Sequence, residues 1–139
     1  MSLKTRFATA VALVTFALPV VSKAQDHCSN STLNGSYGLH ATGTIIGVGN
    51  FAAVGRFTFD GRGNLTGKLF VRVNGNNNTL TITGTYSVSP DCTVSDVWKI
   101  SDGSTSTHES VLVDEGKEYF ILNNTLGDPS VISGEAKRQ

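Results

Sequence analysis

Gly55–Phe70 reads GRFTFDGRGNLTGKLF and contains the pattern that the rest of the chain repeats. Phe57 and Phe59 alternate with polar residues, and Leu65 and Leu69 do the same after the segment DGRGN. An apolar residue at every second position is typical of a β-strand with one buried face. The two glycines between the runs supply the backbone conformations that a tight connection needs. The stretch therefore predicts a β-hairpin.

The same alternation on both sides of this hairpin predicts eight strands in all. They are expected at Ser36–Ile45, Phe51–Asp60, Asn64–Val73, Thr79–Val88, Cys92–Ser101, Ser106–Val113, Glu118–Leu122 and Ser130–Lys137. Because the connections are short, neighbouring strands must be antiparallel. An open sheet of eight strands would leave two unpaired edges, which closure removes. We therefore predict an all-β fold, a single antiparallel up-and-down β-barrel of about eight strands, with a two-sheet β-sandwich as the alternative.

The interior of this barrel is expected to be mostly aromatic and aliphatic. The in-phase residues are Phe57, Phe59, Leu69, Ile82, Tyr86 and Trp98. Glycines inside the strands fit a small barrel whose strands bend sharply; they are Gly38, Gly43, Gly55, Gly67, Gly84 and Gly134. An eight-stranded barrel has room for its own side chains or for one small ligand. The residues predicted to contact such a ligand are Phe57, Phe59, Tyr86 and Trp98.

The first 24 residues have the features of a secretory signal peptide. Lys4 and Arg6 give a positive start, and Phe7–Val21 is an apolar stretch of 15 residues. Ser22-Lys23-Ala24 then places small residues before a cut at Gln25. A membrane anchor is the alternative, but the stretch is shorter than the roughly 20 residues that span a bilayer. We expect a secreted or periplasmic protein with one domain over residues 25–139 and no membrane span.

Charge and cysteine content restrict the possible partners. Without Lys4, Arg6 and Lys23 the chain has 11 − 3 = 8 Lys and Arg against 11 Asp and Glu, a net charge of −3. Nucleic-acid binding depends on clustered Lys and Arg that meet phosphates, so no nucleic acid is expected. Cys28 and Cys92 are the only cysteines, and outside the cytoplasm they are expected to form a disulfide.

Three stretches resemble a known group of small exported bacterial proteins. They are LNGSYG at 33–38, GRFTFDGRGNLTG at 55–67 and TGTYSVSPDCT at 83–93. These proteins are similar to the allene oxide cyclase barrel-like domain, a calycin-type β-barrel. The resemblance spans nearly all of residues 25–139 and implies the barrel fold. Its motifs are turn and strand signatures, and no functional residue of the cyclases matches a position here.

Two acidic residues are the candidates for chemistry. Asp96 shares a strand face with Val94 and Trp98, so it is a carboxylate inside the barrel if that face is buried. Burial raises a carboxyl pKa and can produce a general acid or base. Glu109 is in phase with Val111 and is expected near Trp98 if the two strands pair. The alternative for both residues is an ordinary position in contact with water.

The three histidines do not predict a metal site. His27, His40 and His108 are scattered along the chain and are expected to be exposed to solvent. A zinc site needs three or four converging ligands. We therefore predict neither a metal nor a cofactor.

The sequence leaves three classes of function open. The first is a barrel that holds a small apolar or amphipathic ligand. The second is a cyclase or isomerase of the allene oxide cyclase-like type, which needs the same cavity and in addition a perturbed acid. The third is a structural or surface protein whose barrel is filled by its own side chains.

Overall fold

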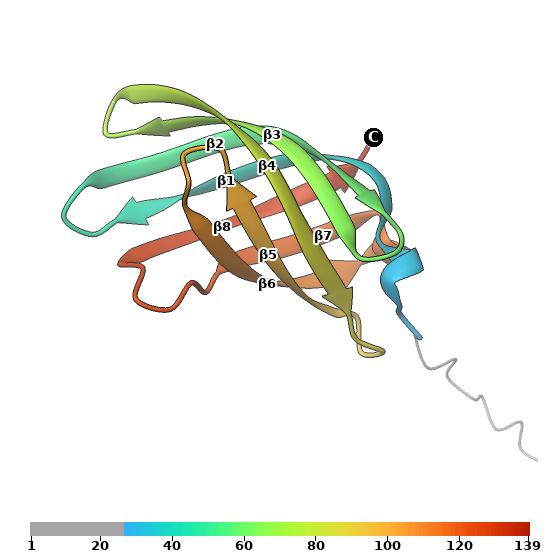
Figure 1. The fold of residues 1–139 in the computed structure, drawn as a ribbon. Coiled ribbons are helices and arrows are strands. Elements are labelled where there is room, and N and C mark those ends of the chain that lie inside the picture. The colour runs from blue at the N-terminus through green and yellow to red at the C-terminus, as the bar shows by residue number, and fades with distance from the viewer. Residues whose placement is uncertain (1–26) are drawn as a thin grey trace, which may run out of the picture.

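The computed structural model describes residues 27–139 and contains a closed barrel of eight antiparallel strands (Figure 1). The strands are β1 (Asn34–Ile45), β2 (Gly49–Asp60), β3 (Asn64–Val73), β4 (Asn76–Val88), β5 (Thr93–Ile100), β6 (Thr105–Val113), β7 (Glu118–Asn123) and β8 (Ser130–Arg138). Two 3₁₀ turns complete it, η1 (Asn30–Thr32) and η2 (Asp114–Gly116). The predicted signal peptide, residues 1–24, lies outside the described residues.

Closure depends on the pairing of the first strand with the last. β1 pairs with β2 on one side and with β8 on the other, where Leu39 lies opposite Ala136. Every strand therefore has two partners and no edge remains unpaired. This confirms the up-and-down barrel and excludes the sandwich. β4 begins three residues earlier than its expected start at Thr79, because Asn76–Asn78 pair with Val71–Val73.

The predicted interior is confirmed. Phe57 is completely inaccessible to solvent, and the other five residues expected inside are also buried: Phe59, Leu69, Ile82, Tyr86 and Trp98. Gly67 lies beneath the Phe57 ring, where a Cβ atom would be 2.5 Å from the ring. The close approach of this ring to the backbone is a physical reason for a glycine in the middle of β3.

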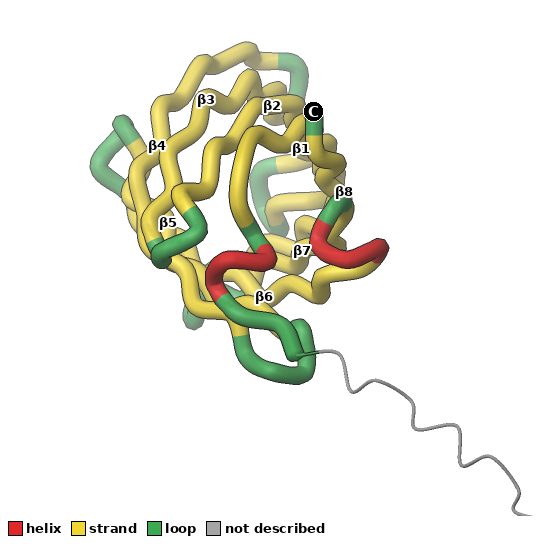
Figure 2. The backbone as a smooth tube through the Cα atoms, turned by 90° about the vertical axis from the view of Figure 1, so that its right-hand side faces the viewer, coloured by secondary structure: helices red, strands yellow, loops and turns green. Residues whose placement is uncertain are grey.

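One end of the barrel is closed by the N-terminal segment (Figure 2). A disulfide joins Cys28 to Cys92, and η1 follows directly after Cys28 and Ser29. The Tyr86 hydroxyl donates to the carbonyl of Leu33 at 2.7 Å, and the Asn30 side chain accepts from the Val88 backbone N–H at 2.8 Å. These contacts hold the segment against the ends of the strands. The predicted disulfide is confirmed.

The same end is tied to the last strand by an arginine. Arg138 donates to the Tyr37 hydroxyl at 2.8 Å and to the carbonyl of Thr32 at 3.1 Å. Tyr37 in turn donates to the carbonyl of Gly116, next to η1. Aromatic rings pack behind it: Tyr37 lies 5.4 Å from Phe59 and 5.6 Å from Tyr119 between ring centroids. This half of the barrel is filled by its own side chains.

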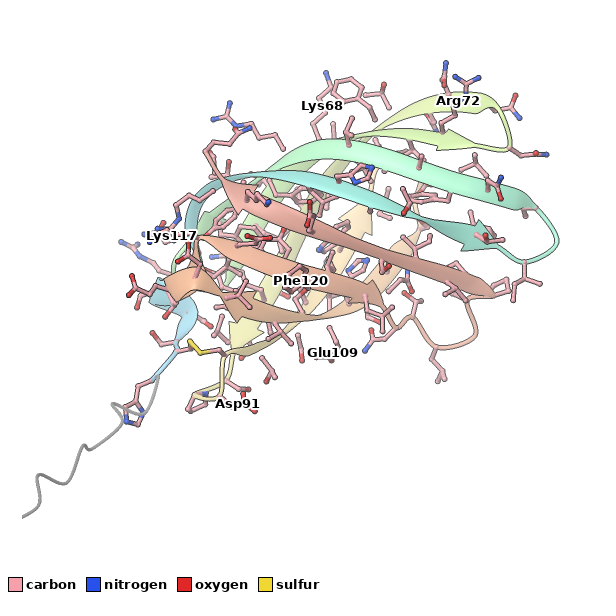
Figure 3. The ribbon with its side chains drawn as sticks, turned by 180° about the vertical axis from the view of Figure 1, so that it is seen from behind. Lys68, Arg72, Asp91, Glu109, Lys117 and Phe120 are labelled. Atoms are coloured by element: carbon pink, nitrogen blue, oxygen red, sulfur yellow. A yellow bond between two sulfur atoms is a disulfide. The ribbon has the colours of Figure 1, made fainter. Side chains whose placement is uncertain are left out.

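The outer face is mostly polar, and side chains such as Lys68 and Arg72 project from it (Figure 3). The phase of β6 differs from the expected one. Val111 faces outward and is about half exposed, whereas Leu112 faces the interior. Val111, Leu112 and Val113 form an unbroken apolar run, so alternation alone does not fix which face is buried.

No helix among residues 27–139 is long and apolar enough to cross a membrane.

Candidate functional site

A cavity of about 220 Å³ occupies the half of the barrel away from η1 and the disulfide. It extends to the β5–β6 turn and the β7–β8 loop, where Ser104 and Asp128 line it and are exposed to solvent. Its lining residues are Leu39, Ala41, Phe51, Ala53, Leu69, Val71, Leu80, Trp98, Ile100, Ser104, Thr105, Ser106, His108, Ile121, Asn123, Asp128, Ile132 and Ser133. The cavity therefore reaches from the buried centre of the barrel to its open end.

The lining has an apolar side and a polar side. β1, β2 and β3 contribute only apolar side chains, among them Leu39, Ala53 and Val71. Most of the polar groups come from the β5–β6 turn, from β6, from the end of β7 and from the loop that follows it, and one comes from β8: Ser104, Thr105, Ser106, His108, Asn123, Asp128 and Ser133. Small residues open the space on the apolar side, since Ala41 lies opposite Ala53 in the register of β1 and β2. The arrangement suits an amphipathic molecule.

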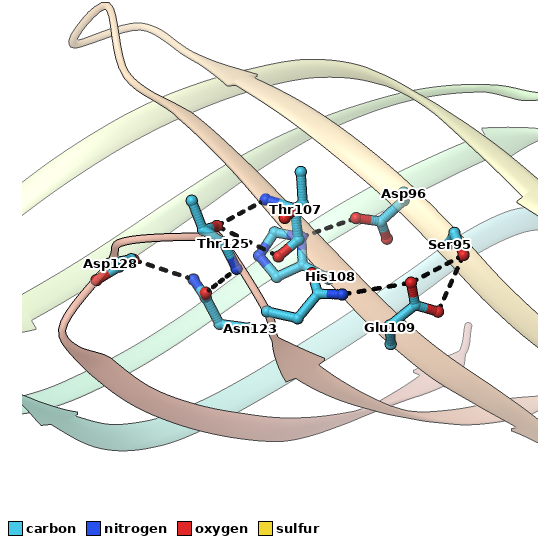
Figure 4. Close-up of polar contacts among 9 residues, drawn as sticks. Ser95, Asp96, Thr107, His108, Glu109, Asn123, Thr125 and Asp128 are labelled. Carbon is cyan, nitrogen blue, oxygen red and sulfur yellow. Dashed lines mark hydrogen bonds and ion pairs between the residues drawn. The ribbon is translucent and has the colours of Figure 1, made fainter.

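A buried acid–base pair lies on the polar side (Figure 4). Asp96 of β5 lies opposite His108 of β6, and both side chains point into the barrel. Asp96 Oδ1 is 2.7 Å from His108 Nδ1, and the side chains are only 4% and 8% exposed. Buried polar groups are stable only when they are hydrogen-bonded, and this contact satisfies Asp96 Oδ1 and His108 Nδ1.

The electrostatics of the pair are dominated by burial. Burial raises the pKa of Asp96 above its ordinary value of 3.8. The hydrogen bond from His108 and the charge that His108 carries when protonated oppose this shift, and the polar N–H of Trp98 adds a smaller opposing contribution. The ionised form of Asp96 is therefore stabilised mainly by His108, against the effect of burial.

The pair fixes the orientation of the imidazole. When Asp96 is ionised it accepts the proton of Nδ1, so the neutral ring carries its hydrogen on Nδ1 and an unshared electron pair on Nε2. Nε2 makes no hydrogen bond with residues 27–139 and is not fully buried. Since His108 lines the cavity, Nε2 is the ring nitrogen that the contact with Asp96 leaves available to a bound molecule.

Trp98 forms the aromatic part of the polar side. Its ring centroid lies 4.0 Å from that of His108 and 4.6 Å from that of Phe57. Among the residues that the structure describes, Trp98 Nε1 and Ser106 Oγ are buried without a hydrogen-bond partner, and so is the hydroxyl of Tyr119. The interior therefore contains more polar groups than its own side chains satisfy.

The four residues predicted to contact a ligand do not lie together around the cavity. Trp98 lines it, whereas Phe57, Phe59 and Tyr86 are absent from its lining. Phe59 packs edge-to-face against Tyr86 with ring centroids 5.2 Å apart, in the filled half. Phase along a strand predicts that a side chain points inward, but not whether it meets another side chain or an empty space.

The structure separates the two acidic candidates. Asp96 is buried and faces the interior, so it is the carboxylate inside the barrel that the strand pattern allowed. Glu109 lies on the outer surface, where its carboxylate accepts from the Ser95 hydroxyl at 2.9 Å (Figures 3 and 4). The expected approach of Glu109 to Trp98 is wrong, because Trp98 lies opposite Ser106 in the register and Glu109 opposite Ser95.

His108 is the functional candidate that sequence reasoning missed. His27 and His40 are exposed as expected, but His108 is buried, so the expectation of an exposed side chain is wrong for it. Counting back from a two-residue turn at Asp102-Gly103 would place Glu109 opposite Asp96. The observed register is instead centred on Asp102, because Ile100 bonds to Ser104 across a three-residue connection, and this one-residue difference brings His108 opposite Asp96. No three His, Cys, Asp or Glu side chains between residues 27 and 139 gather to hold a metal ion.

No protein-family model and no curated protein matches this chain. Solved structures of designed barrels do match it. A de novo designed fluorescence-activating β-barrel has a TM-score of 0.59 at 12% identity, covering 79% of this chain and 96% of its own.

Two further barrels, both bound to DFHBI, are similar. EF1p2_mFAP2b has a TM-score of 0.60 at 12% identity, over 78% of this chain and 94% of its own. The redesigned barrel mFAP1 has a TM-score of 0.56 at 13% identity, over 78% of this chain and 97% of its own. At such identities the likeness establishes the barrel fold of this chain and nothing about its chemistry.

Proposed function

We propose that this protein holds a small amphipathic molecule in the open half of its barrel. The observation that carries the proposal is the cavity itself, with an apolar wall on β1–β3 and a polar side formed mainly by β6, the end of β7 and the adjoining loops. It argues against a barrel filled throughout by its own side chains. The similar barrels bound to DFHBI support the proposal, because the same architecture accommodates a small molecule in them.

The size of the cavity limits the ligand. An engineered apolar cavity of about 150 Å³ binds benzene, and this one is larger, at about 220 Å³. It is smaller than the roughly 300–1,000 Å³ of most drug-sized sites. A single aromatic ring or a short acyl chain with one polar group fits this range, and a longer molecule would extend through the open end.

The test combines native mass spectrometry with a cavity-filling variant. A co-purifying small molecule is expected when the protein is taken from its own host. Purified protein should bind benzyl alcohol, and Ala53→Leu should weaken this binding because residue 53 lines the cavity. Ala52→Leu is the matched control, since Ala52 is the exposed neighbour of Ala53.

Circular dichroism verifies the fold of both variants, because overpacking a core costs about 1–3 kcal/mol. An empty protein that binds neither benzyl alcohol nor toluene would remove the proposal.

A second candidate function rests on the Asp96–His108 pair. A basic Nε2 supported by a buried carboxylate is the arrangement of a general base. Beside an apolar cavity it would serve an isomerase or cyclase acting on an apolar substrate. The motif resemblance to allene oxide cyclase-like barrels supports this candidate through the fold only.

Substitution distinguishes the two functions once a ligand is identified. His108→Gln removes the base and Asp96→Asn removes the carboxylate that supports it, while both leave the apolar wall intact. Loss of turnover with binding retained would support an enzyme. A ligand that is recovered chemically unchanged from the wild-type protein would support a carrier.

We propose further that the protein acts outside the cytoplasm. The disulfide between Cys28 and Cys92 supports this location, because disulfides persist in oxidising compartments. Mass spectrometry of the protein recovered from the periplasm or medium is the test, and a chain that begins at Gln25 is expected. An intact N-terminus in the cytoplasmic fraction would contradict it.

A further inference from the structure

The charges around the cavity are unbalanced. Every Lys and Arg between residues 27 and 139 is exposed, and none lines the cavity. The acidic groups, by contrast, include Asp96 behind His108 and Asp128 at the open end. A ligand that carries negative charge would therefore meet carboxylates and no fixed positive charge.

The hydrogen-bonding capacity of the polar side points the same way. With Nδ1 engaged by Asp96, the neutral His108 ring offers the electron pair of Nε2 to the cavity as an acceptor. A molecule that donates a hydrogen bond satisfies this atom. If the molecule is also positively charged, it compensates the buried carboxylate of Asp96, which has no cationic partner apart from a protonated His108.

We propose that the molecule held in the cavity is a small amphipathic primary amine, an inference that rests on the proposed ligand-binding function. Its ammonium group donates to His108 Nε2, and the charge of Asp96 stabilises it through the imidazole. Its apolar body, of about one ring, lies against the wall formed by Leu39, Ala53 and Val71. The Trp98 ring of β5 lies beside the His108 ring, with the centroids 4.0 Å apart, so an ammonium group at Nε2 would lie close to the face of the indole.

Other polar groups fit the site less well. A carboxylate would place an anion near Asp96 and Asp128 without a cation to neutralise it. An alcohol donates one hydrogen bond to His108 but leaves the charge of Asp96 uncompensated. A purely apolar molecule leaves Nε2 without a partner, which costs free energy in a water-poor cavity.

Trp98 provides a direct readout, because it is the only tryptophan in the chain and lines the cavity. The full-length mature protein is titrated at pH 7 with benzylamine, benzyl alcohol, benzoate and toluene, which share one ring. Changes in Trp98 fluorescence give the dissociation constants, and calorimetry verifies them. Benzylamine is expected to bind about tenfold or more tightly than benzyl alcohol, because its hydrogen bond is charge-assisted. Benzoate is expected to bind most weakly of the four.

Substitutions test whether the preference for benzylamine depends on Asp96 and His108. His108→Phe should bring benzylamine down to the affinity of toluene while toluene still binds. Asp96→Asn should reduce the benzylamine preference and leave the binding of benzyl alcohol nearly unchanged. His40→Phe is the control, since His40 is exposed on the outer face of β1. Melting curves show whether each variant is folded. If a variant does not fold, the order of the four dissociation constants in the wild-type protein tests the amine assignment.

The two proposals fail in different ways. Binding of all four probes with similar constants, or tightest binding of benzoate, would overturn the amine assignment and leave the ligand-binding function standing. If toluene and the other three probes all fail to change the fluorescence or produce heat, the ligand-binding function itself fails.

Discussion

Replacement of His108 by leucine tests whether the Asp96–His108 pair is an electrostatic unit. The substitution leaves an apolar side chain beside Asp96 and removes the 2.7 Å hydrogen bond. Because the Asp96 side chain is only 4% exposed, water does not replace the lost partner. Removing one member of a buried ion pair costs about 3–5 kcal/mol. For a domain of this size the melting temperature should fall by roughly 4 °C per kcal/mol.

The cost should depend on pH, and the direction follows from the pKa of Asp96. Burial raises this pKa above 3.8, and His108 supplies the two largest opposing effects. In His108→Leu the folded-state pKa of Asp96 therefore rises further. Stability from a group whose pKa is raised by folding is fully present below the unfolded pKa and is lost as the pH rises through the folded pKa. The variant should lose several kcal/mol at pH 7 but only about 1 kcal/mol near pH 4, where Asp96 is protonated.

Urea unfolding monitored by Trp98 fluorescence gives the free energy of unfolding of wild type and variant at both pH values. The control is the double variant Asp96→Leu/His108→Leu, which removes both polar groups and should recover most of the stability lost at pH 7. An equal loss at pH 7 and pH 4 would refute the electrostatic explanation. The cost would then come from packing alone.

Three further predictions concern the filled half and the loops. Removing the disulfide with Cys28→Ser should lower the free energy of unfolding by about 4 kcal/mol in the chain-entropy model, since the bond joins residues 64 apart; an unchanged urea midpoint would contradict this. Tyr119→Phe should be neutral or stabilising because its buried hydroxyl has no partner in the described chain, whereas Tyr37→Phe should cost about 1–2 kcal/mol by removing bonds to Gly116 and Arg138. Comparable losses in the two variants would refute the distinction. The pKa of Asp60 should be about 2, because the Asn64 side chain and then the backbone N–H groups of Asn64 and Arg62 stabilise the carboxylate. Its stabilising effect is therefore present above the unfolded pKa and disappears as the pH falls through about 2. A carboxyl ¹³C titration midpoint near 3.8 would contradict this.

The strand pattern and the disulfide were predictable from the sequence because both depend on local or simple rules. Period-two alternation in segments such as Gly55–Phe70 predicts strands with one buried face, and the short turns between them require antiparallel neighbours. Closure followed from the edges that an open sheet would leave unpaired. Cys28 and Cys92 were the only two cysteines available to each other.

The site depended on register and on three-dimensional packing. His108 and Asp96 lie 12 residues apart and meet only because the β5–β6 turn sets their register. In β6 the apolar run Val111-Leu112-Val113 allowed either phase, and the tertiary structure placed Leu112 inside and Glu109 outside. The cavity in one half of the barrel depends on the packing of all eight strands. Phe57 and Trp98 both point inward, and only the way in which all eight strands pack decides that Trp98 faces a cavity while Phe57 does not.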